Sequence, residues 1–330
     1  MRTLPGSCVA VTGASGFVGR QLVKQLLKQK CGVRVLLRAQ SPNPFPGLKA
    51  VEVVRGDITD FASVGELVRN VSAVFHTAAL VVPWVKNPAI QYKINVGGTQ
   101  CVLRIAAASQ IPVVCTNSIA ALAPYPPPVS IRWLDGNHYV KSKRTCLRLV
   151  QKARSRGVQA YSVIPSGIVG PEDCRPTAIG HLVSDISQNH GRLICFNGGL
   201  YLVDVSDVAE AHWRALGQEP ADYVLPGEYW SLDRLFTAIG HAAGKETRLL
   251  RVPYLTTLLG SKLLSIWSSV WTNKPPVITP AWVHYFRQAI SMKYQDDSGR
   301  LGIKQTPVSQ SIENTVAWFS RQCCRGIGTL

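Results

Sequence analysis

The chain has 330 residues, of which 46 % are hydrophobic, so it is long enough for one α/β unit with a sizeable core and a smaller appended lobe. No internal repeat or low-complexity tract is evident, which excludes repeat and fibrous architectures. The formal net charge of +17 admits nucleic acid as a partner, but no nucleic-acid motif is present and the basic residues are spread along the chain. We therefore expect no nucleic-acid partner, but attraction to a phosphate-bearing cofactor, an anionic substrate or an anionic membrane surface.

Near its start the chain reads as a strand, a glycine-rich turn and a helix. Residues 9–11 are apolar and β-prone, as in a buried parallel strand, and residues 20–28 place apolar side chains at helical spacing. Gly13, Gly16 and Gly19 stand between them. The first permits a sharp turn, the second lets a pyrophosphate approach the backbone, and the third lets the helix pack closely. Because the amides and dipole at a helix start favour an anion, this arrangement predicts a dinucleotide site.

The end of the second predicted strand bears on the choice of cofactor. NAD enzymes of this architecture usually place an acid there to bind the ribose 2′-hydroxyl, whereas this chain has Arg38 and no adjacent acid. A carboxylate would repel a 2′-phosphate, but a guanidinium can bind one through two hydrogen bonds. We therefore predict NADP(H). Arg38 also fits a solvated surface arginine, and a tolerant pocket would accept NAD(H) as well.

A second motif carries groups suited to proton transfer. Tyr139 and Lys143 are four residues apart and share one face of a predicted helix. An isolated tyrosine has a pKa of about 10, and an ammonium or a positive nicotinamide ring beside it would favour the phenolate. Ser118 follows an earlier strand and would stabilise charge on a substrate oxygen. The set predicts hydride transfer at a carbinol or carbonyl carbon, with Tyr139 as acid or base and no metal.

These motifs resemble the short-chain dehydrogenase/reductase superfamily and, within it, the extended branch. The phosphate turn has the family's Thr-Gly-x-x-Gly-x-x-Gly spacing. Further segments resemble the branch's motifs in the branch's order, and the whole resemblance covers residues 7 to 320. The matching segments after the turn are 56–60, 75–79, 95–99, 114–118, 165–171 and 203–212.

The resemblance implies a role for each matched residue. Ser118, Tyr139 and Lys143 would be catalytic, and Lys143 would also hold the nicotinamide ribose. We expect His76 and His212 to be structural. The residues implied to bind the cofactor are Gly13, Ser15, Gly16, Phe17, Val18, Gly19, Arg38, Asp57, Ile58, Ala78, Ala79, Asn95, Tyr139, Lys143, Pro165 and Ile168.

The implied fold class is α/β, a Rossmann-type doubly wound parallel sheet with a smaller C-terminal substrate lobe. Residues 1–175 would form mainly the NAD(P)-binding Rossmann domain, and residues 176–330 mainly the substrate-binding lobe. The strand and helix at 201–216 would return to the Rossmann core. Members of this family often pair through helices, so a homodimer remains open.

The cysteines bear on the compartment. Nine cysteines are scattered without metal-type spacing, and their odd number in a Rossmann-type chain argues for reduced thiols. No secretory signal stands before the first predicted strand. We therefore expect a cytoplasmic protein.

Residues 252–271 are rich in Leu, Ile, Val and Trp, but Gly260, Lys262 and several hydroxyl residues make them a poor transmembrane span. Leucines fall near one helical face and hydroxyl residues near another. Two interpretations remain open. The segment is an interfacial amphipathic helix that makes the protein peripheral at a membrane surface, or it is a lobe helix that covers an apolar pocket. Either interpretation favours an apolar substrate.

Within the extended branch, this segment, the Lys-Pro-Pro at 274–276 and the Tyr-x-x-Ser-Lys at 139–143 resemble the 3β-hydroxysteroid dehydrogenase and dihydroflavonol reductase-like group. Ile164 departs from the Arg common there, and Arg38 favours the reductases. We predict an NADP(H)-dependent oxidoreductase that interconverts a ketone and a secondary alcohol on a fairly apolar small molecule, sterol-, flavonoid- or polyketide-like. The alternatives are an NDP-sugar epimerase or dehydratase with transient hydride transfer, and a non-catalytic NADPH-binding scaffold.

Overall fold

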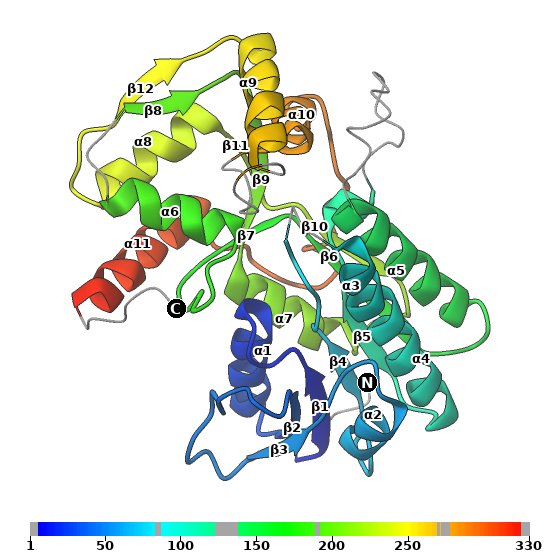
Figure 1. The fold of residues 1–330 in the computed structure, drawn as a ribbon. Coiled ribbons are helices and arrows are strands. Elements are labelled where there is room, and N and C mark those ends of the chain that lie inside the picture. Colours follow the sequence, from blue (N-terminus) through cyan, green and yellow to red (C-terminus); the bar gives the residue numbers. More distant parts are fainter. Residues whose placement is uncertain are drawn as a thin grey trace.

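The computed structural model describes residues 6–82, 87–122, 138–188, 192–268, 271 and 278–324. The chain forms a large sheet with helices on both faces and a smaller lobe beside the sheet (Figure 1). Residues 269–270 and 274–276, which entered the sequence analysis, lie outside the described residues.

Seven parallel strands form the large sheet, in the order β10-β6-β5-β4-β1-β2-β3. The winding direction reverses between β1 and β4, which is the Rossmann arrangement and confirms the predicted fold class. The central strands are short, rich in β-branched residues and buried, as expected for a parallel sheet that helices cover on both faces. Their bounds are β1 Cys8–Thr12, β2 Gly32–Leu37, β3 Val51–Arg55, β4 Val74–His76, β5 Val113–Thr116, β6 Ala160–Pro165 and β10 Asp222–Leu225.

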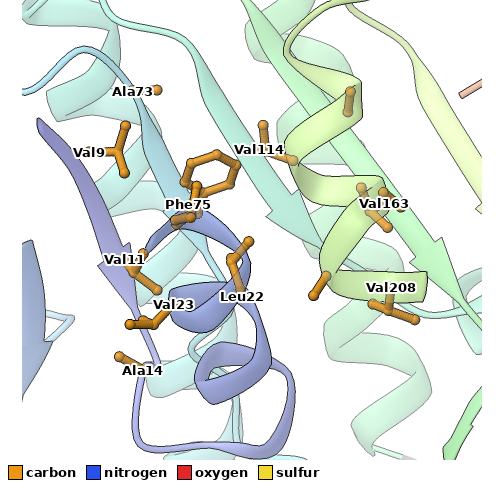
Figure 2. Packing of buried hydrophobic residues seen from close by; sticks show 14 of the residues in the cluster. Val9, Val11, Ala14, Leu22, Val23, Ala73, Phe75, Val114, Val163 and Val208 are labelled. Atoms are coloured by element: carbon orange, nitrogen blue, oxygen red, sulfur yellow. The ribbon is translucent and has the colours of Figure 1, made fainter. Parts of the chain in front are cut away.

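Helices cover both faces because successive strand residues point to opposite sides. Val9 and Val11 of β1 pack toward α1 and α7, whereas Ala10 belongs to the cluster beneath α2 and α4. Figure 2 shows the first of these clusters, with Phe75, Val114 and Val163 continuing it across the sheet. The helices flanking the sheet are α1 Phe17–Lys28, α2 Phe61–Leu67, α3 Pro88–Tyr92, α4 Gly98–Ala108, α5 His138–Arg154 and α7 Val205–Ala215.

The second half of the chain returns to the large sheet at two points. Helix α7 packs against α1, and β10 pairs with the outer edge of β6. The strand expected to return with α7 is β9, Gly199–Asp204, and it does not join the large sheet. It pairs instead with β7, Gly167–Val169, and β11, Glu228–Ser231. The reason is that β10 already occupies the edge of β6 at which another strand could be added.

The lobe has its own apolar cluster, which includes Val183, Trp230, Leu235 and Phe319. The last helix fixes the lobe to the junction between β9 and α7, because the Ser311 hydroxyl donates to Asp204 over 2.5 Å. The elements of the lobe beyond β7, β9 and β11 are α6 Ala178–Gln188, β8 Arg192–Cys195, α8 Leu232–Ala242, β12 Arg248–Arg251, α9 Tyr254–Trp267, α10 Pro280–Gln288 and α11 Val308–Cys324.

Two glycines allow β1, α1 and the segment after β4 to approach each other closely. Gly13 has a φ of +73°, and a Cβ placed there would lie 2.5 Å from the Ala78 nitrogen. A Cβ at Gly19 would lie 2.2 Å from the Gly13 carbonyl oxygen. Both obstacles are backbone atoms, which cannot rotate away. The turn therefore requires residues without side chains at both positions.

We expect Gly13→Ala to lower the free energy of unfolding by at least about 2 kcal/mol, because left-handed strain adds to a backbone clash. Gly65→Ala in α2 is the matched control, since nothing lies within 4 Å of the added Cβ. That change should raise the free energy by about 0.5–1 kcal/mol. Urea unfolding followed by circular dichroism measures both. An unchanged stability of the Gly13 variant would contradict this account of the turn.

Candidate functional site

The predicted site residues converge on one edge of the large sheet. Thr12, His76, Thr116 and Pro165 are the last residues of β1, β4, β5 and β6, four neighbouring parallel strands. The carboxyl ends of parallel strands meet at one edge, and ligands of open α/β sheets bind outside that edge where the winding reverses. The glycine turn and Ala78 follow directly from two of these ends.

The glycine turn leads into the amino end of α1. Gly16 precedes the helix in an extended conformation, and Phe17, Val18 and Gly19 form its first residues. The amides of a first helical turn have no partner within the helix, and the helix dipole is positive there. The first turn of α1 contains no acidic residue. Ser15 lies inside the turn. The backbone amides and the positive end of the helix dipole fit a pyrophosphate at this place.

Arg38 follows β2 and is exposed to solvent. Its backbone carbonyl accepts a 3.0 Å hydrogen bond from Arg55, which also donates to the Ser41 carbonyl over 2.5 Å. Arg55 therefore fixes the segment that carries Arg38. Sequence reasoning did not select Arg55, although it ends the neighbouring strand and pairs in register with Leu37.

Asp57 lies in the same neighbourhood as Arg38. Hydrogen bonds from the Thr59 hydroxyl, at 2.7 Å, and from the Thr59 backbone, at 2.8 Å, hold the pKa of Asp57 below its usual value. The positive charges of Lys93 and Arg38 lower it further. Ile58 packs partly buried against the core. Asp57 is thus an ionised acceptor beside the end of β2, where an adenosine ribose would lie.

A buried chain of hydrogen bonds links the first strand to the helices on the far side of the sheet. The Thr99 hydroxyl lies 2.7 Å from the Asn95 carbonyl, which can only accept, so Thr99 donates there. Its oxygen then accepts from His76 Nε2 at 3.1 Å, which leaves His76 Nδ1 to accept from the Thr12 hydroxyl at 2.8 Å. Burial lowers the pKa of His76 to about 3, so the ring is neutral, as this pattern requires.

Asn95 lies in a short π-helical segment, Lys93–Gly97, and its side chain is fully engaged with the protein. Its amide oxygen accepts from the Leu80 nitrogen over 2.7 Å, and its amide nitrogen donates to the Leu80 carbonyl and the Ser142 hydroxyl. Ser142 in turn donates to the Tyr139 carbonyl over 2.8 Å. Asn95 therefore fixes the first turn of α5 against the segment after β4, a positioning role that sequence reasoning did not assign to it.

The three residues expected to be catalytic lie together. Ser118 follows β5, and its hydroxyl hydrogen-bonds the Tyr139 hydroxyl. Lys143 is 5 % exposed and donates to the Thr116 carbonyl over 3.1 Å. Thr116 is fixed in turn by His212 of α7, whose Nε2 lies 2.7 Å from the threonine hydroxyl. The end of β5 and the first turns of α5 thus present a phenol, a hydroxyl and an ammonium side by side.

His212 is a neutral buried anchor, as the sequence suggested. Its Nδ1 lies 2.7 Å from the Val208 carbonyl and must donate, so its Nε2 accepts from the Thr116 hydroxyl. Burial lowers the pKa of His212 to about 4, which keeps the ring uncharged.

Burial raises the pKa of Tyr139 to about 12, against the direction expected from an adjacent ammonium. The hydrogen bond with Ser118 is what lowers the pKa of Tyr139. The Lys143 ammonium donates instead to the Thr116 carbonyl. Burial also lowers the pKa of Lys143, which the neighbouring Cys146 and Cys115 partly oppose. Tyr139 is therefore a protonated phenol at neutral pH, ready to donate rather than accept.

The lobe supplies residues that the sequence did not single out. Tyr285 of α10 lies near Tyr139, and its pKa is raised by burial and further by Tyr294 and Tyr139. Tyr294 contacts Tyr201 edge-on with ring centres 5.3 Å apart. Pro165 ends β6 of the large sheet, and Ile168 lies in β7, which pairs with β9. No local sequence signal connects α10 to the Tyr139 motif.

Fold and site together define a Rossmann-type protein with a glycine turn at the start of its first helix. The family model described as "NAD dependent epimerase/dehydratase family" matches residues 9–225. The chain therefore belongs to the NAD-dependent epimerase/dehydratase family.

Three proteins that are similar to this chain in sequence carry different names. A putative dihydroflavonol 4-reductase of Synechocystis sp. is 30 % identical, with 94 % of each chain covered. Sterol demethylase protein B of Methylococcus capsulatus is 28 % identical over 94 % of this chain and 97 % of its own. A ceramide reductase of Caulobacter vibrioides is 27 % identical over 84 % and 83 %.

Solved structures share the fold. The crystal structure of gox2253 superposes with a TM-score of 0.79 and 25 % identity, covering 96 % of this chain and 98 % of that one. The UDP-glucose 4-epimerase of Thermus thermophilus, solved with NAD, gives a TM-score of 0.66 at 20 % identity, covering 97 % and 100 %. At that identity the likeness concerns the fold alone.

Within the part of the chain that the structure describes, no helix is both long and apolar enough to cross a bilayer.

The two buried histidines make stability depend on pH. Each histidine has a lower pKa in the folded chain than in the unfolded chain. As the pH falls below about 6.5, the unfolded chain is therefore protonated at these positions while the folded chain stays neutral. The free energy of unfolding falls as the pH drops from about 6.5 to about 3 for His76 and to about 4 for His212. At pH 5 each should cost about 2 kcal/mol relative to pH 8.

Urea unfolding at pH 8 and pH 5 tests this expectation. His212→Asn should reduce the difference between the two pH values by about 2 kcal/mol relative to the wild type. The control is His241→Asn on α8, where the side chain is exposed and the wild-type difference should persist. Equal differences in the wild type and the His212 variant would contradict the prediction.

Proposed function

We propose that this chain is an NADP(H)-dependent oxidoreductase that interconverts a ketone and a secondary alcohol on a fairly apolar substrate. The observation that carries the proposal is the contact between Ser118 and Tyr139 beside the buried Lys143, at the sheet edge that also holds the glycine turn. The names of the relatives, two of them reductases, support the same reaction class.

The turn fits a dinucleotide, because the first turn of α1 contains no acidic residue and a Cβ at Gly16 would meet only the Gly13 carbonyl oxygen within 4 Å, so a phosphate can approach this backbone. When bound, NADPH would supply the hydride. Ser118 would donate a hydrogen bond to the substrate carbonyl oxygen, and Tyr139 would deliver its proton to that oxygen as negative charge develops. Lys143, held by the Thr116 carbonyl, would position the ribose hydroxyls next to the phenol.

The protonated phenol of Tyr139 is the form that reduction of a ketone requires. A phenol with a pKa of about 12 is almost wholly protonated at neutral pH, so it is ready to serve as the acid that reduction needs. Alcohol oxidation would first require its deprotonation.

The aromatic residues of the lobe favour an apolar substrate. Tyr285 lies near Tyr139, and it neighbours Phe286 and Trp282 with ring centres 6.0 and 5.6 Å apart. Buried aromatic rings offer large apolar contact area and a few polar tips, which suits a ring-containing ketone better than a charged sugar nucleotide. We therefore place sterol-, flavonoid- and polyketide-like ketones first.

The cofactor preference can be measured without a known substrate. The wild type should bind NADPH more tightly than NADH in a fluorescence titration, because Arg38 would pair with the 2′-phosphate. Arg38→Asp should weaken NADPH binding by about tenfold to a hundredfold and leave NADH binding nearly unchanged. Arg69→Asp is the control for a lost surface charge, since Arg69 is exposed just after the end of α2 and pairs with Glu66. A wild-type preference for NADH would reject NADP(H).

The role of Tyr139 can be tested once a ketone substrate has been found by NADPH consumption. Tyr139→Phe should lower kcat by about 10²–10⁴-fold and leave the Kd for NADPH unchanged. Tyr161→Phe is the matched control, because it removes a buried phenol on β6, whose hydroxyl donates to the Gln218 carbonyl over 3.3 Å. Near-normal turnover by the Tyr139 variant would remove this residue from the acid role.

The alternative reaction, epimerisation or dehydration of an NDP-sugar, makes a different prediction. That chemistry returns the hydride, so it converts the sugar without net NADPH consumption. A screen of sterol ketones, phenolic ketones and NDP-sugars that follows both NADPH absorbance and product formation separates the two. Redox-neutral conversion of a sugar would replace the proposal made here.

A further inference from the structure

Helix α9 is amphipathic with its apolar side turned outward. Its large apolar side chains are among the most exposed in the described protein, between 44 and 76 % of their full surface when Trp271 is included. They project from one half of the helix circumference. These residues are Leu255, Leu259, Leu263, Leu264, Ile266, Trp267 and Trp271.

Two serines at this helix, Ser261 and Ser268, face the protein. Ser261 and Ser268 are 1 % and 4 % exposed, respectively. The serine hydroxyls hydrogen-bond to carbonyl groups of their own helix. Ser261 donates to the Leu258 carbonyl and Ser265 to the Ser261 carbonyl, each over 2.8 Å. A helix at a water-facing surface normally shows the opposite arrangement, with leucines inward and serines outward. The outward face of α9 is therefore built for an apolar environment.

Basic residues predominate around α9, although Arg248 and Arg251 of β12 also pair with Glu246 and Asp233, respectively. From residue 247 to residue 293 the sequence contains six basic residues and no acidic residue. Arg248 and Arg251 of β12 stand just before the helix with side chains 73 % and 76 % exposed. Lys262 lies on α9, and Arg287 is exposed on α10, which packs against α9. An apolar helix face bordered by basic residues matches an anionic lipid surface, where tails accept leucines and headgroups attract the cations.

The length of the helix decides between lying on a bilayer and crossing it. The 14 residues of α9 extend about 21 Å, shorter than a hydrocarbon core of about 30 Å. Trp267 and Trp271 stand at one end of the outward face, where indole rings suit the headgroup level. Figure 1 shows α9 at the end of the lobe opposite β2 and β3, with α10 packed beside it.

We propose that the outward face of α9 docks onto an anionic membrane surface, with the helix lying in the plane of the interface. The leucines and Ile266 enter the boundary between headgroups and acyl chains, and the basic residues of β12 and α10 contact the lipid phosphates. Sequence alone left this interpretation beside a pocket-covering helix, and the exposure of the leucines and the burial of the serines favour the membrane.

Co-sedimentation with lipid vesicles tests the proposal. The full chain should bind vesicles of phosphatidylcholine with phosphatidylserine, and bind more weakly to phosphatidylcholine alone or at high salt. Leu259→Glu with Leu263→Glu should reduce the partition coefficient by roughly tenfold for each leucine removed from the lipid. The control is Leu48→Glu, a leucine 47 % exposed on the segment between β2 and β3, far from α9.

Two further measurements keep the outcome decisive. Far-UV circular dichroism and the urea midpoint must match the wild type in the Leu259/Leu263 variant, which is expected because both side chains are exposed. Quenching of tryptophan emission by brominated lipids should be strong in the wild type and largely lost in Trp267→Phe with Trp271→Phe.

Three results would overturn the proposal. The wild type fails to bind anionic vesicles, or a folded Leu259/Leu263 variant binds as well as the wild type. The third is a wild-type dimer in light scattering that the same variant dissociates, with no vesicle binding, which would assign this face to a second copy of the chain.

Discussion

The site depends on one buried chain of hydrogen bonds that crosses the sheet from Thr12 to the first turn of α5. His76 joins the end of β1 to Thr99, and Asn95 joins the segment after β4 to Ser142 and so to Tyr139. The polar groups of this network are buried, so losing a member would leave a partner unsatisfied at considerable cost. The phosphate turn and the phenol belong to different elements, and this network fixes their separation.

The same edge of the sheet is a region of suppressed charge. Burial keeps His76 and His212 neutral, holds Tyr139 protonated and lowers the pKa of Lys143. Charge is retained where solvent reaches, at Arg38 and Asp57. A ligand with a charged phosphate end and an uncharged reacting end would meet a matching gradient along this edge. The chain has many basic residues and few acidic ones. This composition fits a site whose charged end would bind the phosphates of the proposed cofactor.

Local spacing was enough to predict the features whose cause is local. The glycine turn and Arg38 after β2 follow from periodicity and from the backbone demands of Gly13 and Gly19, whereas the doubly wound sheet was implied by the family resemblance. Features that arise from distant segments were not predictable. Arg55 reaches Arg38 through sheet register, and Tyr285 meets Tyr139 only through the packing of the lobe. The pairing of β10 with the edge of β6 likewise depends on which distant segment reaches that edge.

The late position of α7 and β10 has a consequence for synthesis on the ribosome. Six strands of the large sheet are complete when Pro165 emerges, but the helix that covers Val114 and Val163 and the strand that closes the edge of β6 end only at Ala215 and Leu225. At about 5–20 residues per second, the intervening 60 residues take roughly 3 to 12 s. During that interval α7 does not yet cover the apolar sheet face and β10 does not yet pair with the edge of β6. A chaperone that shields nascent strands would therefore bind the chain during this part of translation.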